Sequence, residues 1–103
     1  MQQIADVLSN KGLKAATWEL RNCKGIDEQA LIAFAEFCAE QVKGVDDGWQ
    51  GYYATMAGGF AERAKMGTTE AAAAAYGASW AARRAKRGLQ YAQAKKLSAL
   101  LGL

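Results

Sequence analysis

The sequence predicts an all-α protein: a small single-domain bundle of about five helices that spans residues 1–103. Three observations support this fold class. The chain contains no proline, the residue that most strongly disrupts helix interiors. Its C-terminal third is rich in alanine, the best helix former. Apolar residues make up 51% of the 103 positions, a composition and length typical of one folded domain with a modest core.

Two short helices are predicted in the first quarter of the chain. Apolar residues recur at helical spacing near the N-terminus, and the "SNKG" segment follows them as a C-terminal stop signal. A second helix is predicted over residues 13–23, with Trp18 as its largest apolar anchor and Gly25 just beyond its end. The apolar residues of the first helix are Ile4, Val7 and Leu8.

The third predicted helix has the clearest start signal. Asp27 can cap exposed backbone N–H groups, and Glu28 adds a favourable charge in the first turn. Ile26 and Leu31 flank this cap at the spacing of a hydrophobic staple. The helix is expected to end near Gly44. Its apolar face comprises Leu31, Ile32, Phe34, Ala35, Cys38, Ala39 and Val42.

A fourth helix is predicted to begin after a cap at Asp46 and to run to about residue 66. Gly51, Gly58 and Gly59 lie inside it, and each costs roughly 1 kcal/mol relative to alanine. Either the helix breaks at Gly58 and Gly59, or these glycines allow another backbone to approach. We favour close packing. The expected apolar stripe comprises Trp49, Tyr52, Tyr53, Met56 and Phe60.

The last predicted helix starts at Thr68 or Thr69 as the cap, with Glu70 in its first turn. It is expected to continue through Gly88 to about residue 101. One side of this helix carries methyl groups, which let two helix backbones approach closely, so we expect it to pack against another helix. That side comprises Ala71, Ala74, Ala78, Ala81, Ala82, Ala85 and Ala92.

Charge is distributed unevenly along the chain. The net charge is +3, but residues 1–69 carry seven basic and nine acidic side chains, whereas residues 70–103 carry six basic side chains and one acidic. Such asymmetry is typical of a protein with an anionic partner. The alternative is that the basic helix packs beside more acidic helices of its own fold.

The segment "YGASWAARRAKRGLQY" supplies the candidate partner-binding residues. Aromatic and arginine side chains recur there at helical spacing, so that neighbouring pairs can stack. One interpretation is a core of rings with solvated arginines beside them. The other is a binding face, because Trp, Tyr and Arg dominate interface hot spots. The candidate residues are Tyr76, Trp80, Arg83, Arg84, Arg87 and Tyr91.

Nucleic acid is the second partner class that this segment suggests, because arginines neutralise phosphates and aromatic rings stack on bases. Lys86, Lys95 and Lys96 would join the arginines in such a role. However, the basic residues spread around most of the helix, and no known nucleic-acid-binding motif accompanies them. We therefore rank a protein partner first.

Catalysis is not expected. The chain has no histidine, so the commonest general base and metal ligand is absent. A helix cap explains the acidic pair Asp46 and Asp47, and the glycine pattern lacks the spacing of a phosphate-binding loop. We expect no catalytic residues, no cofactor and no bound metal.

A cytoplasmic location is expected, in the encoding bacterium or in a phage-infected host. The N-terminus lacks the basic-then-apolar run of a signal peptide, and no apolar run approaches the ~20 residues of a membrane span. Cys23 and Cys38 do not form a metal-binding pattern, and we expect them to be reduced thiols. No membrane partner is expected.

Residues 31–103 resemble small alanine-rich helical proteins of bacteria and phages that are described as immunity proteins. The matching segments are "FAEFCAEQV", "GVDDGWQ", "GTTEAAAAAYGASWAA" and "YAQAKKLSALLGL". The resemblance implies a non-enzymatic protein that binds a bacterial protein and occludes a functional surface, as an inhibitor of a defence system would. A third alternative is a structural subunit of a phage particle or a homo-oligomer, with the alanine face pairing between copies.

Overall fold

The computed structural model describes residues 2–23, 25–66 and 68–103 and confirms the all-α class. Within those ranges it contains six α-helices, one 3₁₀ helix and no strand, which is one α-helix more than about five. No helix among the described residues is long and apolar enough to cross a membrane. The helices are α1 (Gln2–Lys11), α2 (Leu13–Glu19), η1 (Leu20–Asn22), α3 (Glu28–Gln41), α4 (Gly48–Ala64), α5 (Thr68–Ala85) and α6 (Gln90–Leu101).

Several helix ends follow the predicted signals. Gly12 separates α1 from α2 with a φ of 91°, a left-handed conformation that glycine adopts without strain. At the start of α3, the backbone N–H of Gln29 donates to Asp27 Oδ1 at 3.0 Å, so the predicted cap is confirmed. Gly44, with a φ of 91°, follows the end of α3.

The start of α4 differs from the prediction. Asp47, not Asp46, occupies the N-cap position, and its side chain makes no capping hydrogen bond. Gly51 explains how the preceding loop fits against this end. A Cβ atom at Gly51 would lie 2.6 Å from the carbonyl carbon of Asp46, so a glycine is needed where the loop passes over the first turn of α4.

The predicted single helix from residue 68 to residue 101 is wrong. It is divided into α5 and α6, because the chain turns between Ala85 and Gln90 and Gly88 adopts a φ of 80°. Ala92 consequently lies on α6, where it is half-buried and not part of the α5 alanine face. The side chains of Thr68, Thr69 and Glu70 lie outside the described part of the structure, so the predicted cap stays a prediction.

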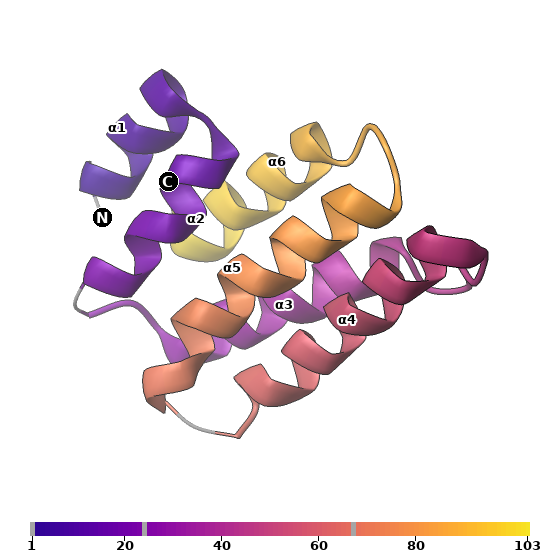
Figure 1. Cartoon of the computed structure of the whole chain (residues 1–103). Helices are drawn as coiled ribbons and strands as arrows, with labels where there is room; N and C mark the ends of the chain where they lie inside the picture. The colour runs from indigo at the N-terminus through magenta and orange to yellow at the C-terminus, as the bar shows by residue number, and fades with distance from the viewer. Residues whose placement is uncertain (1, 24, 67) are drawn as a thin grey trace.

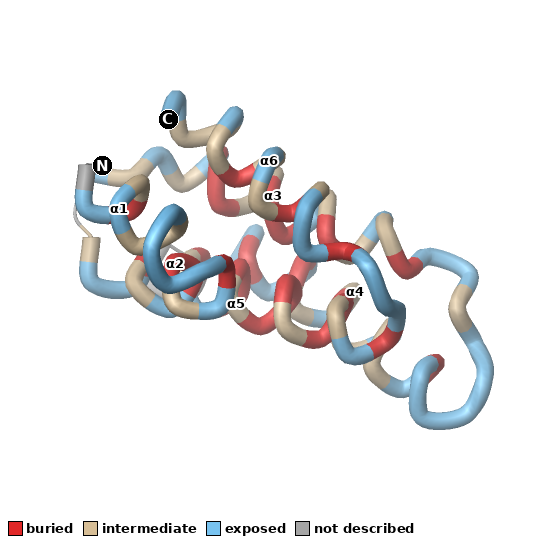
Figure 2. Tube along the Cα trace, turned by 90° about the horizontal axis from the view of Figure 1, so that it is seen from above, coloured by how far each residue is buried: buried red, intermediate tan, exposed pale blue. Residues whose placement is uncertain are grey.

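Helix α5 is the centre of the bundle. It packs most extensively against α4, and also against α3, α2 and η1, whereas α6 packs mainly against α3. Figure 1 shows α4 and α5 side by side and running in opposite directions. The Cα trace extends 39 × 29 × 18 Å, and its smallest dimension corresponds to two layers of helices whose axes are about 8–10 Å apart. Buried residues gather along the middle, and exposed ones at the outer surfaces and loops (Figure 2).

The core combines a few large side chains with many alanines. Phe34, Ile4, Leu20 and Leu97 are among the largest fully buried side chains. The predicted burial of the α5 alanine face is confirmed, since each member on α5 is at most 1% exposed. These members are Ala71, Ala74, Ala78, Ala81, Ala82 and Ala85, and the buried alanines of α4 are Ala57, Ala61 and Ala64.

The predicted apolar stripe of α4 is not its buried face. Trp49 and Tyr52 are 64% and 63% exposed, and Tyr53, Met56 and Phe60 are only partly buried. The alanines of α4 are buried instead, because methyl groups permit the close approach of α5 and bulky rings would hold the two helices apart. Trp18 is likewise not a buried anchor, since it is half-exposed at the surface of α2.

The predicted close approach of another part of the backbone occurs at Gly51, against Asp46, but the prediction is wrong at Gly58 and Gly59 within this chain. Helix α4 is continuous through both residues, and a Cβ atom at either one would meet nothing within 4 Å. A second close approach occurs at Gly77 of α5, where a Cβ atom would lie 2.6 Å from a ring carbon of Phe60. Gly77 thus accepts the Phe60 ring on the α4–α5 contact.

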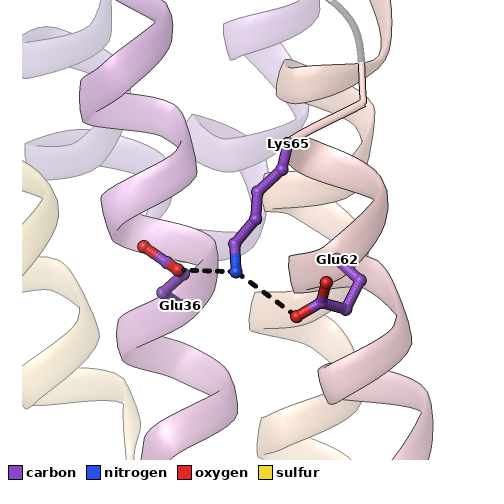
Figure 3. A network of polar contacts seen from close by, with 3 residues as sticks. All are labelled: Glu36, Glu62 and Lys65. Carbon is purple, nitrogen blue, oxygen red and sulfur yellow. Dashed lines mark hydrogen bonds and ion pairs between the residues drawn. The ribbon is translucent and has the colours of Figure 1, made fainter.

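A surface ion-pair network joins α3 to the C-terminal end of α4. Lys65 Nζ lies 3.1 Å from Glu36 Oε2 and 3.3 Å from Glu62 Oε1 (Figure 3). Hydrogen bonding to Glu36, and then to Glu62, raises the pKa of Lys65 above its usual value. All three side chains are substantially exposed, so the network adds little stability.

Candidate interaction surfaces

The turn at Gly88 separates the six candidate partner-binding residues that the sequence places on one helix face. Tyr76, Trp80, Arg83 and Arg84 lie on α5, whereas Arg87 lies in the connection and Tyr91 on α6. The four residues on α5 also contact different neighbouring helices. The structure therefore places the candidate residues in separate environments, and the expected single face is wrong.

Trp80 and Arg84 form a stacked cluster with α4. The Trp80 ring meets the Tyr53 ring edge-on, with centroids 5.5 Å apart. The Arg84 guanidinium lies 5.1 Å from the Tyr53 ring and 5.4 Å from the Trp80 ring. Cation–π contacts of this geometry hold the arginine in place while leaving it exposed. Arg84 is thus a positioned cation and not a freely moving surface side chain.

Beside this cluster is a small hollow at the start of α4 and the end of α5. It has a volume of about 100 Å³, and three of its lining side chains are cationic. Trp49 forms one wall, and the Trp49 ring also meets the Tyr53 ring edge-on at 6.2 Å. We call this feature the Trp49 hollow. Its lining residues are Trp49, Gln50, Arg84, Ala85, Lys86 and Arg87.

Arg83 points away from this surface and into a polar cluster within the bundle. Its Nη1 donates to Ser79 Oγ and, at 3.0 Å, to Gln93 Oε1 of α6. Ser79 Oγ also donates to Gln93 Oε1 at 2.7 Å, and Gln93 Nε2 donates to Gln41 Oε1 of α3 at 3.0 Å. Ser79 and Gln93 are fully buried. Arg83 therefore bridges α5 and α6, and Gln93 extends the cluster to α3, so Arg83 is a structural residue in this conformation.

The polar cluster is electrostatically unusual because its charge has no carboxylate partner. None of the ion pairs among the described residues involves Arg83. Burial lowers the pKa of Arg83 from its usual value. Burial also raises the pKa of the neighbouring Cys38 thiol to about 12, despite the opposing effects of Arg83 and of a hydrogen bond with Ser79. Cys38 is thus a neutral thiol at physiological pH and not an activated nucleophile.

Tyr76 lies near the middle of α5, on the side that contacts α2. Its ring meets the Trp18 ring edge-on at 5.1 Å, and the Arg21 guanidinium lies 4.1 Å from the Trp18 ring centroid. Together with Lys11 and Lys14, these two rings line an open groove of about 450 Å³. Tyr76 consequently belongs to a second basic aromatic surface, which the sequence did not indicate.

Tyr91 belongs to a third surface, formed by α3 and α6. It is 75% exposed, and Lys95 Nζ lies 5.6 Å from its ring centroid. Lys96 Nζ lies 5.5 Å from the Phe37 ring of α3. These four side chains line a shallow groove of about 460 Å³.

Sequence reasoning missed Trp49 as a surface residue. The prediction assigned it to the buried stripe of α4, because large apolar residues recur there at helical spacing. A signal for the opposite assignment was present in Ala57, Ala61 and Ala64, which recur at spacings of four and three residues on another face of the same helix. Small residues on one face of a helix mark the side that a neighbouring helix can approach.

The described residues contain no group of three or more histidine, cysteine, aspartate or glutamate side chains that could hold a metal ion. The surfaces are instead suited to contacts through rings and cations. Comparisons with protein-family models, with curated proteins and with solved structures find no match to this chain. Function is therefore inferred from the geometry of these surfaces.

Proposed function

We propose that this chain is a small non-enzymatic protein-binding module that acts as an inhibitor or immunity-type protein. It binds a bacterial protein, such as a component of a defence system, and occludes a functional surface of that protein. The proposed site of action is the cytoplasm of the encoding bacterium or of a phage-infected host. The resemblance of residues 31–103 to immunity proteins supports this class of function.

The observation that carries the proposal is the Trp49 hollow. An indole that is 64% exposed stands beside three cationic side chains, and one of these, Arg84, is held over two further rings. Tryptophan, tyrosine and arginine are the residues most enriched in interface hot spots. Holding Arg84 in place before binding lowers the side-chain entropy lost on association.

The chemistry of the hollow defines the partner segment. Arg84, Lys86 and Arg87 favour carboxylates, whereas the exposed face of Trp49 favours an apolar or aromatic side chain. We therefore propose an acidic segment with an apolar anchor as the bound element of the partner protein. Arginine can hold a carboxylate through two parallel hydrogen bonds, which adds geometric specificity.

Nucleic acid is the alternative partner, and the same exposed indole and cations favour it, because a base could stack on Trp49 while phosphates contact the arginines. We rank it second because Asp46 and Asp47 are exposed just before Trp49 in the chain. Their carboxylates would repel a polyphosphate backbone that crosses this end of the molecule. An acidic protein segment can place its few carboxylates on the cations and avoid them.

The two partner classes can be separated by capture from bacterial lysate treated with nuclease. We expect the wild-type chain to retain a protein, and the Arg84→Ala/Arg87→Ala variant to lose it. Lys95→Ala/Lys96→Ala removes the same charge from α6 and serves as the matched control, with capture expected to persist. Truncating either arginine should cost on the order of 2 kcal/mol in affinity for the identified partner.

Titration with generic duplex and single-stranded DNA and RNA tests the alternative directly. We expect little binding near physiological ionic strength. Micromolar binding that persists there, falls steeply with salt and weakens in Arg84→Ala/Arg87→Ala would favour the nucleic-acid function instead. In that case each lost charge should reduce the salt slope by about one unit.

A further inference from the structure

The groove between α2 and α5, beside the end of α1, has the features of a small-ligand site, and we call it the Trp18 groove. Its volume of about 450 Å³ lies within the ~300–1,000 Å³ that is typical of such sites, which are mostly apolar with a few polar groups. It shares no lining residue with the Trp49 hollow, so a ligand here is independent of the proposed function. The lining residues are Lys11, Lys14, Ala15, Trp18 and Tyr76.

The indole of Trp18 is held in place, although it is 50% exposed. The Tyr76 ring meets it edge-on with the ring centroids 5.1 Å apart, and the Arg21 guanidinium lies 4.1 Å from its centroid. Arg21 does not line the groove, so it fixes the indole without occupying the space beside it. An aromatic ligand can therefore stack on a ring whose position is set before binding, which lowers the entropy lost on association.

The positive charge beside this ring has no carboxylate partner. Lys11 ends α1, and the turn at Gly12 brings it to the same groove as Lys14 of α2. Both lysines are exposed, and no ion pair within the described ranges includes either of them. Two like charges that line one groove repel each other, and an anion between them would remove this repulsion.

Two carboxylates on the same helices make other contacts. Glu19 Oε1 accepts a hydrogen bond from Gln3 Nε2 of α1 at 2.5 Å. Asp6 lines a separate hollow on α1, which Lys11 also borders. Neither carboxylate lines the Trp18 groove, so the two lysines give its lining a net positive charge.

We propose that the Trp18 groove binds a nucleoside monophosphate. The base stacks on the Trp18 ring, because every base presents a π face to an aromatic side chain. The phosphate lies between Lys11 and Lys14. A phosphate monoester has a charge of about −1.5 to −2 at pH 7 and three acceptor oxygens, so it matches two ammonium groups better than a single carboxylate does.

The first test is a titration of the chain with adenosine monophosphate (AMP), followed by the indole N–H signals in NMR spectra. Trp18→Phe and Trp49→Phe assign these signals. We expect AMP to shift the Trp18 signal saturably, with a dissociation constant below about 1 mM, and to leave the Trp49 signal unchanged. Trp49 is the matched control within the same molecule, because it is also exposed beside cations. No saturable shift up to about 10 mM AMP, or equal shifts of both signals, would overturn the proposal.

Three related probes separate the contributions of the base and the phosphate. Adenosine lacks the phosphate, inorganic phosphate lacks the base, and cyclic AMP keeps the base but carries a phosphodiester with a single charge. Each should bind several-fold more weakly than AMP. If inorganic phosphate binds as tightly as AMP, the ring plays no part. If adenosine or cyclic AMP binds as tightly, the phosphate dianion plays none, and either result contradicts the proposed ligand class.

Paired substitutions locate the site. Lys11→Ala/Lys14→Ala should raise the dissociation constant for AMP at least about fivefold, because two exposed charge contacts are lost. Lys95→Ala/Lys96→Ala removes the same charge from α6 and should leave the constant unchanged. Circular dichroism of both variants confirms that the helices are intact. Equal losses in the two variants would show that AMP responds only to net charge, and the site would be wrong.

Discussion

Helix α5 meets its neighbours in two contrasting ways. Toward α4 it presents alanines and Gly77, and the contact is apolar, with the Phe60 ring over the glycine. Toward α6 and α3 it presents Ser79 and Arg83, which are joined through Gln93 to Gln41. The first contact depends on shape alone, because small groups allow many dispersion contacts. The second depends on every hydrogen-bond partner being present, since a buried polar group without a partner is costly. The two contacts should therefore respond differently to substitution.

The largest loss of stability is expected for a substitution in the polar cluster. Gln93→Leu removes the acceptor of Arg83 and Ser79 and the donor to Gln41, so it should lower the free energy of unfolding by roughly 3 kcal/mol. Chemical denaturation measures this loss. Gln90→Leu, at an exposed position of the same helix, is the control and should have little effect.

A triple variant sharpens this prediction. Ser79→Ala/Arg83→Met/Gln93→Leu replaces the cluster by apolar groups, so no buried donor is left without an acceptor. We expect it to be more stable than Gln93→Leu alone, since apolar replacement of a complete buried polar set can be nearly neutral. Losses that simply add would show that the members of the cluster act independently.

The apolar contact between α4 and α5 should be sensitive to added volume. Ala78→Leu and Ala81→Leu add bulk where both residues are fully buried, and each should destabilise the fold by about 1–3 kcal/mol through overpacking. Ala73→Leu, on the exposed side of α5, is the matched control. Denaturant midpoints that are equal in all three variants would contradict the close packing of α5.

Cys38 reports on the polar side of α5 through pH. Its pKa is raised to about 12 by burial, whereas the unfolded thiol ionises near 9.0, so the unfolded state loses its proton first as pH rises. The stabilising effect is complete below pH 9.0 and is lost as pH rises toward 12. Between about pH 8 and pH 10, unfolding should become easier by about 1 kcal/mol. The measurement compares how steeply the free energy of unfolding changes with pH in the wild type and in Cys38→Ala. The difference between the two isolates Cys38, because other groups also titrate in both proteins.

Cys23 provides the comparison for that measurement. Burial raises the pKa of Cys23 as well, with a further contribution from Glu19, but this thiol is only partly buried. Cys23→Ala should consequently leave most of the pH dependence intact. A thiol reagent should modify Cys23 in the native protein and reach Cys38 only on unfolding.

The smallest loss of stability is expected for a substitution in the ion-pair network at the end of α4. Lys65→Gln removes both contacts, but Glu36 and Glu62 remain solvated, so the unfolding midpoint should move least among these variants. The contribution of Lys65 is present below its usual pKa of 10.5 and is lost as pH rises through its raised value. The difference from wild type should vanish in concentrated salt. A shift as large as that of Ala78→Leu would contradict this ranking.

The sequence predicts the parts of the fold that local chemistry determines. The helical class, the Asp27 cap and the α5 alanine face follow from proline content, capping preference and periodicity. The division at Gly88 does not, because glycine is tolerated inside helices at a cost of about 1 kcal/mol. The helix ends before Gly88 because α6 packs on α3 and Gln93 contacts Ser79, and both of these contacts are long-range in the sequence.

The candidate binding residues were harder to predict for a related reason. Arg83 and Arg84 are neighbours in the sequence, but successive helical residues are about 100° apart. One consequently enters the bundle and the other stacks over Tyr53 at the surface. Trp49 and Tyr52 recur at helical spacing with partly buried residues, and the positions of α3 and α5 determine which face of α4 is covered. Both outcomes depend on tertiary contacts that a periodicity cannot encode.

The position of α1 has a consequence for how the molecule opens over time. Helix α1 packs mainly against the short α2, whereas α5 contacts α4, α3, α2 and η1 (Figure 1). Backbone amides exchange with solvent through local openings, and segments with few tertiary contacts open at lower free energy than the core. Deuterium should therefore enter α1 first and the middle of α5 last. We therefore expect α1 to open and close many times while α5 remains closed, and a protease to cut there before the rest of the bundle is exposed.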